Sequence, residues 1–323
     1  MTTANQTWIL RPPRMEDVPA VASLLNACAV ADYGSPNTDV QTLKAEWEEP
    51  TLVLDEECRL AASTDGLALG FAEVWNVAEG EAQNLQAYIY VAPHCGDTAL
   101  PGQLWDWAEA RACHEYARTQ STHPRTLWTK TAETNRPERA VLEGRGYRII
   151  RHSWRMTLDL NSPIPPPVWP KAIRVRTFVR GQDEQVVFAV RNEGYSDMWG
   201  YTPVPFELWE YHLIQANARF DPTLWFIAVE DDEIAGICLC DSQMDDDPKM
   251  ADVKCVVTRR NCRRRGIASA LLRHAFAEIA KRDIPRVGLG VDAESLTGAH
   301  KVYEKVGMKV ARQYDRWEKV LAC

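Results

Sequence analysis

Five prolines within ten residues divide the chain almost at its midpoint. The segment Asn161–Pro170 reads NSPIPPPVWP. Proline removes the backbone donor that a helix or a sheet needs, and it stiffens the chain towards an extended conformation. We therefore expect this segment to connect two structured parts of the 323-residue chain. Each part has about 160 residues, which is enough for a separate hydrophobic core.

The sequences on either side of this segment repeat one order of elements. Each begins with a short strand, Trp8–Arg11 or Ile173–Phe178, and continues into a helix, which the pattern predicts over Glu184–Asn192 in the second half. Strands and helices mix irregularly in both, which favours an α/β (α+β mixed) fold over a strict alternation of the two. A repeat of about 165 residues is a duplicated domain rather than a solenoid unit. We predict two domains and a linker: residues 1–160, 161–172 (the linker) and 173–323.

Composition and charge exclude several classes of protein. Hydrophobic residues make up 46% and charged residues 25%, as in ordinary globular proteins. The formal net charge of −8 disfavours a nucleic-acid binder or a protein of anionic membrane surfaces. No apolar stretch reaches the ~18–20 residues of a membrane span, and the polar start Met1–Gln6 is not followed by the apolar run of a signal peptide. These features predict a cytoplasmic protein.

The nine cysteines are scattered along the chain. No Cys-x2-Cys pair is present, and Cys238-x-Cys240 is too closely spaced for an ordinary zinc site. We therefore predict no metal site. The cysteines are expected to be reduced thiols, most of them within the core.

The most informative stretch is Val253–Leu272. It starts as an apolar strand and ends as a helix with apolar residues four positions apart, and Arg263-x-x-Gly266-x-Ala268 lies between them. A strand that turns sharply into a helix leaves backbone N–H groups pointing one way, next to the positive end of the helix dipole. Gly266 and Ala268 allow a ligand to approach the backbone. The pattern predicts a cradle for a diphosphate, although a basic run can also be a solvated surface.

A second block follows after the strand Arg286–Asp292. Together, and in this order, the two blocks resemble the GNAT superfamily of N-acetyltransferases. The first resembles that family's [Q/R]-x-x-G-x-[G/A] loop, and the second its D-A-x-N-x-x-x-A-x-x-L-Y-E-x-x-G-[FM] pattern. The second block matches at Asp292, Ala293, Ala299, Val302, Tyr303, Glu304, Gly307 and Met308. It departs from the pattern at Ser295, where the family has asparagine.

The resemblance implies a fold, a donor and an acid. The fold is two tandem GNAT-like domains, each a mixed, mainly antiparallel sheet flanked by helices. The donor is acetyl-CoA, and Tyr303 is the general acid that protonates the departing thiolate. Alternatively, the ring of Tyr303 only packs between helix and sheet. The residues expected to contact acetyl-CoA are Val256, Val257, Thr258, Arg263, Arg264, Arg265, Gly266, Ile267, Ala268, Ser295 and Tyr303.

The acceptor side of the reaction is less defined in the sequence. Asp241, Asp252 and Asp292 lie at the ends of predicted strands and are candidate general bases, and a chain of water molecules is an equal alternative. Trp199 and Trp209 could wall an aromatic acceptor pocket, but packing in the core is the simpler interpretation.

The first half resembles the same fold without the loop. At the equivalent positions, Gly96 stands in place of the arginine, Ala99 in place of the key glycine, and Pro101 in place of the second small residue. Proline offers no N–H to a phosphate, so we expect a degenerate copy that binds no donor. The tandem layout is similar to that of the mycothiol synthase group of double-domain acetyltransferases.

The resemblance thus implies an acetyl-CoA-dependent N-acetyltransferase whose second domain transfers an acetyl group to a primary amine. A small-molecule amine is favoured over a protein as the acceptor, and we expect no nucleic-acid or membrane partner. An acyl-CoA-binding sensor without efficient turnover is the alternative, since Ser295 departs from the family pattern. A scaffold that keeps only the fold is disfavoured by the intact Arg263–Ala268 loop. The oligomeric state is left open.

Overall fold

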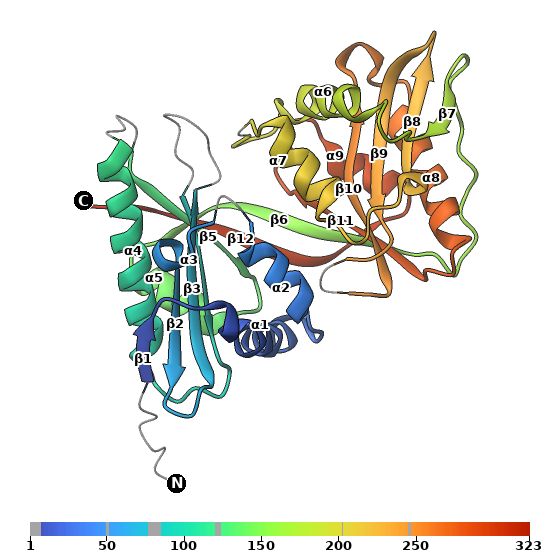
Figure 1. The fold of residues 1–323 in the computed structure, drawn as a ribbon. Helices are drawn as coiled ribbons and strands as arrows, with labels where there is room; N and C mark the ends of the chain where they lie inside the picture. The colour runs from blue at the N-terminus through green and yellow to red at the C-terminus, as the bar shows by residue number, and fades with distance from the viewer. Residues whose placement is uncertain (1–7, 50–51, 77–84, 120–123, 202, 245–246) are drawn as a thin grey trace. The chain divides into compact units, whose positions relative to one another are not determined.

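We describe the chain from a computed structural model (Figure 1). The structure describes residues 8–49, 52–76, 85–119, 124–201, 203–244 and 247–323. Met1–Gln6, on which the expectation of no signal peptide rests, lies outside these residues. The chain forms two compact units: unit 1 runs to Ile150 and takes in Tyr314–Cys323, and unit 2 comprises Arg151–Gln313.

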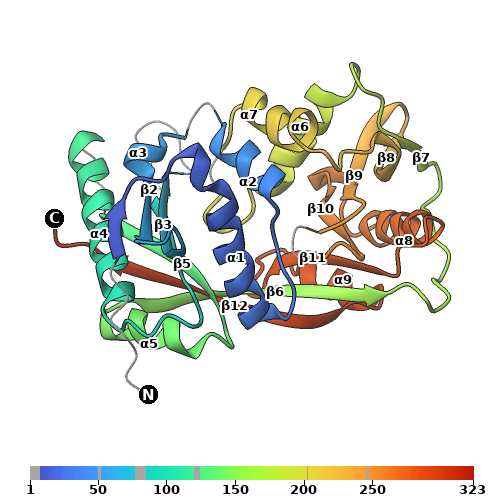
Figure 2. The same ribbon diagram turned by 60° about the horizontal axis from the view of Figure 1, so that its bottom comes forward.

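Unit 1 is a sheet with helices on both faces. Its strands lie in the order β1-β2-β3-β4-β5-β12, and the described pairs are antiparallel except β4 with β5. Helices α1 and α2 cover one face, and α4 and α5 cover the other (Figure 2). The elements are β1 (Trp8–Arg11), η1 (Met15–Asp17), α1 (Val18–Tyr33), α2 (Val40–Trp47), α3 (Leu54–Glu57), β2 (Cys58–Ser63), β3 (Ala68–Asn76), β4 (Leu85–Val91), α4 (Leu100–Thr119), β5 (Thr126–Ala132) and α5 (Arg136–Gly144).

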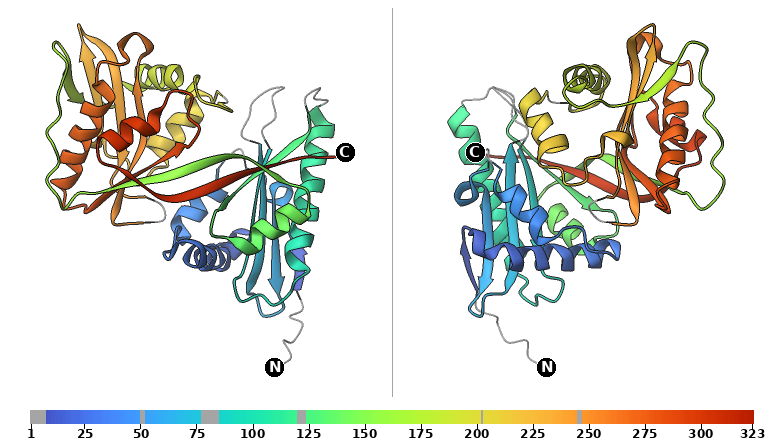
Figure 3. Two further views of the ribbon diagram at one scale, coloured as in Figure 1. Left: turned by 180° about the vertical axis from the view of Figure 1, so that it is seen from behind. Right: turned by 45° about the vertical axis from the view of Figure 1, so that its right-hand side comes forward.

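Unit 2 repeats this plan. Its strands lie in the order β6-β11-β10-β9-β8-β7, and the pairs are antiparallel except β10 with β11. Helices α6 and α7 cover one face, and α8 and α9 cover the other (Figure 3). The elements are β6 (Arg148–Asp159), β7 (Arg174–Thr177), α6 (Glu184–Tyr195), α7 (Phe206–Glu210), the π-helical turn η2 (Tyr211–Gln215), η3 (Pro222–Leu224), β8 (Trp225–Glu230), β9 (Glu233–Asp241), β10 (Met250–Thr258), η4 (Arg260–Cys262), α8 (Ile267–Ala280), β11 (Arg286–Asp292), α9 (Ala299–Lys305) and β12 (Lys309–Val320).

One ion pair fixes the same corner in both units. Arg11 of β1 makes a two-pronged hydrogen bond to Asp17, at 2.7 Å for each contact, just before α1 begins. Arg176 of β7 does the same with Asp183, at 2.6 and 2.8 Å, just before α6. The predicted duplication and the predicted α/β class, with a mixed and mainly antiparallel sheet in each copy, are confirmed.

The compact units differ from the predicted division at 161–172. Ser153–Asp159 of β6 pairs with β11 in unit 2, and Tyr314–Val320 of β12 pairs with β5 in unit 1. Each unit therefore takes its last strand from the other half of the sequence. The proline-rich segment has neither helix nor strand between Ser162 and Pro170, and its Ile164 and Trp169 pack against the core of unit 2.

The expectation that all cysteines are reduced thiols is wrong for one pair. Cys113 of α4 and Cys323 form a disulfide, with Cα atoms 5.6 Å apart. The two residues are 210 positions apart in sequence, so no local pattern could reveal the pairing. The other seven cysteines are free thiols, and five of them are buried: Cys58, Cys238, Cys240, Cys255 and Cys262.

We predict that the Cys113–Cys323 disulfide stabilises the folded chain. Replacing Cys113 by serine should lower the free energy of unfolding by about 2–4 kcal/mol, because the cross-link restricts the unfolded chain. Denaturant unfolding measures this loss, and Cys95→Ser, at a half-buried free thiol, is the matched control. Thiol titration of the denatured, unreduced protein should count seven reactive groups; a count of nine would contradict the disulfide.

Helix α6 lies unusually close to β10. A Cβ atom added at Gly194 would lie 2.4 Å from Cγ1 of Val257, well inside van der Waals contact. Gly194→Ala should therefore destabilise the protein by about 1–3 kcal/mol through overpacking. In a Val257→Ala background, where the two Cγ atoms are absent, the same substitution should cost less. Equal losses of unfolding free energy in the two backgrounds would show that this contact is not the cause.

Candidate functional site

Strands β10 and β11 run side by side for only three residues of each strand. Met250–Asp252 pairs with Arg286–Gly288, after which β11 continues along β6 and β10 continues along β9. From Val253 onwards, no described strand pairs with the edge of β10 that faced β11. An unpaired edge of this kind can take up an extended ligand through main-chain hydrogen bonds.

Alternation along β10 decides which residues face this open edge. The N–H of Arg259, just beyond the strand, donates to the carbonyl of Ala235 in β9 at 3.0 Å. Backbone groups of an antiparallel strand alternate between its two neighbours, so Val257 also faces β9. Val256 and Thr258 therefore turn their backbone groups to the open edge. Of the three residues predicted here, two are placed to offer main-chain groups.

A β-bulge opens this part of β10. The register with β9 shifts between Val253 and Cys255, so Lys254 is the extra residue. The hydroxyl of Tyr195 donates to the carbonyl of Lys254 at 3.2 Å. The sequence predicted helix only as far as Asn192, but α6 continues to Tyr195 and carries that ring to the bulge. Gly194 permits this close approach of α6 to β10, because it has no side chain. This glycine was the feature of the sequence that could have indicated the contact.

The predicted loop and helix follow the strand. Arg264 and Gly266 adopt the left-handed backbone region, with φ of 62° and 89°, and α8 starts directly afterwards at Ile267. No side chain caps this helix within the described residues, so its first N–H groups are available to a ligand. The side chain of Ile267 is buried in the core, which leaves only its backbone for binding.

The arginines around the loop are paired with carboxylates. Arg263 contacts Asp197 at 2.7 Å, and its Nε donates to the carbonyl of Thr258 at 3.3 Å. Arg265 forms a two-pronged ion pair with Glu230 of β8. Arg264 makes no ion pair within the described residues. The charge of the loop is therefore partly neutralised before any ligand arrives.

Tyr303 lies on α9 and packs in the core of unit 2. Its side chain is 8% exposed, and it belongs to the same hydrophobic cluster as Cys238. Burial raises its pKa above the usual value for tyrosine, and nearby Cys255 and Cys238 add to the shift. Burial also raises the pKa of Cys255, to about 12. Both groups are therefore protonated at neutral pH.

The three aspartates considered as bases are all engaged by cations. Lys254 contacts Asp252 at 3.0 Å and Asp241 at 3.7 Å, and Asp241 also accepts hydrogen bonds from Asn217. Asp292 accepts from Nε of Arg151 at 2.8 Å. No pattern in the sequence indicated that Lys254 would contact both Asp241 and Asp252.

The remaining predicted residues, Ser295, Trp209 and Trp199, lie in three different environments. Ser295 lies in the exposed turn before α9, with its hydroxyl 3.1 Å from that of Thr297. Trp209 is 2% exposed and packs in the core with Phe188, as the simpler interpretation expected. Trp199 is partly exposed, and the guanidinium of Arg151 lies over its ring at 4.7 Å.

Unit 1 has lost the features of this loop. The bond from Cys95 N–H to the Ala92 carbonyl matches that from Cys262 to Arg259, which fixes the alignment of the two loops. The carboxylate of Asp97 then accepts from the N–H of Ala99 at 2.8 Å, at the start of α4. A negative side chain thus occupies the helix N-terminus that is uncapped in unit 2.

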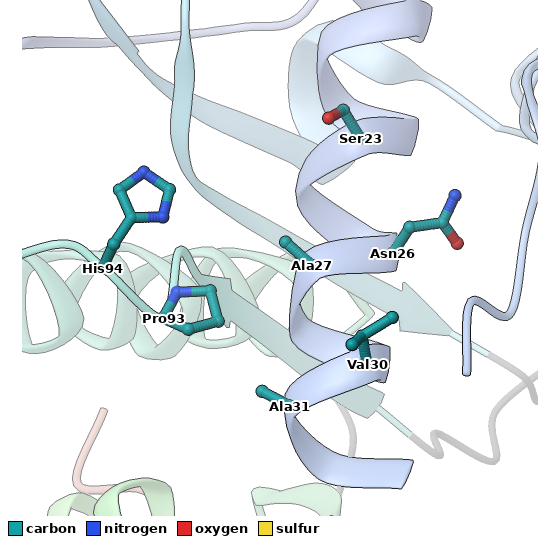
Figure 4. Close-up of a pocket in the computed structure, with 7 residues that line it drawn as sticks. All are labelled: Ser23, Asn26, Ala27, Val30, Ala31, Pro93 and His94. Atoms are coloured by element: carbon teal, nitrogen blue, oxygen red, sulfur yellow. The ribbon is translucent and has the colours of Figure 1, made fainter. Parts of the chain in front are cut away.

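An open hollow lies beside this altered loop. Figure 4 shows that it is lined by one face of α1 and by the turn that follows β4. Its lining is mostly small and uncharged: Ser23, Asn26, Ala27, Val30, Ala31, Pro93 and His94. Asn26 is not available to a ligand, because its side chain holds the backbone of Asn37 and Thr38.

The described residues include neither a metal-binding cluster nor a membrane-spanning helix. They contain no cluster of three or more His, Cys, Asp or Glu side chains arranged to hold a metal ion. None of the described helices is long and apolar enough to cross a membrane.

Curated relatives match about half of the chain. The mycothiol acetyltransferase of Thermobispora bispora is 28% identical over 178 residues, which are 54% of this chain and 57% of that protein. The mycothiol acetyltransferase of Thermomonospora curvata is 24% identical over 249 residues, 77% of each chain. The chain therefore spans only about half the length of the first of these relatives.

Solved structures match over the whole chain. A tandem GNAT protein from the clavulanic acid biosynthesis pathway shares the fold, with a TM-score of 0.71 and 16% identity, over 98% of this chain and 99% of that one. The GCN5-related N-acetyltransferase from Sphaerobacter thermophilus is 32% identical, with a TM-score of 0.80, over 99% of this chain and 97% of that one.

A family profile agrees with these likenesses. The acetyltransferase (GNAT) family matches residues 191–308, which include the open edge of β10, the loop and Tyr303. Together with the 32% identity over nearly the full length of a solved member, this match shows that the chain belongs to the GCN5-related N-acetyltransferase family.

Proposed function

We propose that the chain transfers the acetyl group of acetyl-CoA to a primary amine of a small molecule, at a site in unit 2. Members of this family take their acyl group from an acyl-CoA. The observation that carries the proposal is the open edge of β10 leading directly to the uncapped start of α8. An extended arm can bind the first, and an anion the second.

The residues present fit the donor. Val256 and Thr258 offer main-chain groups that can pair with the amide-bearing pantetheine arm, as a neighbouring strand would. The N–H groups of the first turn of α8 can bind the diphosphate, and Gly266 and Ala268 leave room for its approach. Arg263 and Arg264 add positive charge beside it. These groups would hold the thioester near the bulge at Lys254.

We propose that Tyr303 acts as the acid. When the acceptor amine forms its bond to the acetyl carbon, the carbon–sulfur bond breaks and the sulfur leaves with the electron pair. The thiolate then needs a proton. A raised pKa keeps Tyr303 protonated at neutral pH, so that its hydroxyl can donate. In this proposal, Tyr303 supplies that proton and is reprotonated from solvent.

The acceptor amine must lose a proton as well. Asp241, Asp252 and Asp292 already stabilise Lys254 or Arg151, so taking up a proton would break an ion pair. We propose that water carries this proton away. The proposal of a small-molecule acceptor is supported by the relatives named mycothiol acetyltransferase, which acetylate a small molecule.

We propose a single donor site per chain, because Asp97 occupies the start of α4 in unit 1. Calorimetric titration with acetyl-CoA should give a stoichiometry of one. Ala268→Glu should weaken binding by roughly tenfold or more, because it places a carboxylate at the diphosphate while favouring the helix N-terminus. Pro101→Glu, at the equivalent position of unit 1, is the matched control and should bind as wild type does. A stoichiometry of two, or equal losses in both variants, would contradict the single site.

Tyr303→Phe tests the acid. The ring and its packing are kept, so acetyl-CoA affinity should stay close to that of the wild type. The rate of acetyl transfer should fall by roughly 10²–10⁴-fold, the usual contribution of a general acid. The rate is measured as thiol release from acetyl-CoA in the presence of a panel of amines, and the affinity for acetyl-CoA is measured by calorimetric titration. Tyr116→Phe, at a buried tyrosine of unit 1, should keep full activity.

Two other outcomes would overturn this role or the activity itself. Turnover of Tyr303→Phe within about threefold of wild type, with chemistry limiting the rate, would remove Tyr303 as the acid. Tight binding of acetyl-CoA without thiol release for any amine would favour the alternative, a sensor that binds acyl-CoA without turnover.

A further inference from the structure

The carboxylate of Asp197 forms ion pairs with two arginines of the loop. Asp197, two residues beyond α6, contacts Arg260 at 2.6 Å and Arg263 at 2.7 Å. Its side chain is 26% exposed, so solvent and ligands can reach it. Hydrogen bonds from both arginines lower its pKa, and it is therefore ionised at neutral pH. Two positive charges beside the proposed diphosphate site, those of Arg260 and Arg263, are thus already opposed by an anion of the same unit.

A second carboxylate supports this arrangement. Glu193, in the last turn of α6, accepts from Nε of Arg259 at 3.0 Å and from the N–H of Arg260 at 2.8 Å. The end of α6 therefore meets the start of the loop through two acidic side chains. Glu193 holds the backbone of the loop. Asp197, within the described residues, bonds instead to the side chains of Arg260 and Arg263.

Unit 1 lacks both sides of this contact. The ion pairs before α1 and α6 align Asp17 with Asp183, and this places Ala31 at the position of Asp197. The loop alignment places Pro93 and Gly96 at the positions of Arg260 and Arg263. Ala31 and Pro93 line the open hollow shown in Figure 4. The acid and its arginines are therefore present together or absent together.

We propose that Asp197 is the resident counter-anion of the donor site, which holds Arg260 and Arg263 in the free protein and is displaced from them by the diphosphate of the coenzyme. This inference rests on the proposed function. Asp197 acts through the arginines and is a positioning residue: it lowers the affinity for the donor and partly neutralises the loop when the coenzyme is absent.

The charges favour this exchange. Guanidinium groups bind phosphate oxygens through paired, charge-assisted hydrogen bonds, and a diphosphate offers more acceptors and more charge than one carboxylate. It also gains the N–H groups of α8. An ion pair exposed to solvent is weak, so little is lost when Asp197 leaves.

The test is the affinity of Asp197→Asn for coenzyme A, measured by calorimetry. Asparagine keeps the shape of the side chain and removes its charge. We expect binding to tighten by about two- to fivefold, the scale of an exposed ion pair. Its dependence on salt should also become steeper, because both arginines are free for the diphosphate. Binding of pantetheine, which lacks the diphosphate, should not change.

A matched control separates this effect from net charge. Glu278→Gln makes the same charge change at the far end of α8, where Glu278 pairs with Lys281 at 2.7 Å. Its affinity for coenzyme A should equal that of the wild type. A tightening as large as that of Asp197→Asn would show that overall charge, and not displacement, is the cause.

The outcomes distinguish this inference from the proposed function. If the wild type binds coenzyme A but Asp197→Asn binds it equally or more weakly, displacement is wrong and the donor site stands. If Asp197→Asn tightens coenzyme A and pantetheine alike, the diphosphate is not what competes with Asp197. If the wild type binds no coenzyme A, both proposals fail.

Discussion

The parting of β10 from β11 is the constraint on which the rest of the site depends. Two parallel strands that stay paired leave no main-chain group for a ligand. Here the pairing ends at Asp252 and Gly288, and the bulge at Lys254 turns the rest of β10 along β9 alone. The open edge then runs directly into the loop and the start of α8. One break in a sheet thus aligns a surface for an extended arm with a site for an anion.

Comparison of the two units distinguishes the open strand edge, which both have, from the charged side chains of the loop, which differ between them. Unit 1 also parts its parallel strands, since β4 pairs with β5 only over Leu85–Gln86. Its loop, however, has no arginine, and Asp97 accepts a hydrogen bond from the N–H of Ala99 directly before α4. The parted strands belong to the fold itself, whereas the proposed donor site depends on a few side chains beside them. In unit 2, Asp197 contacts Arg260 and Arg263, and in unit 1 the three equivalent positions are Ala31, Pro93 and Gly96.

The sequence predicted well those features that are local. The strand, the loop around Gly266 and helix α8 follow from apolar spacing and two small residues within twenty positions. The non-local features were beyond it. Strand β6 pairs with β11 in unit 2 and strand β12 pairs with β5 in unit 1, each with a partner far away in sequence, and the Cys113–Cys323 disulfide joins residues 210 positions apart. Likewise, Asp197 meets Arg263 only because α6 extends three residues further than its pattern predicted.

The most direct test of this account is amide hydrogen exchange with and without acetyl-CoA. We predict slower exchange at Val256 and Thr258 on the open edge, and at Ile267 and Ala268 in the first turn of α8. The amides of Leu100 and Gly102, at the equivalent helix of unit 1, should exchange at unchanged rates. Protection confined to unit 1, or protection in unit 2 that leaves Thr258 and Ala268 unaffected, would contradict the account.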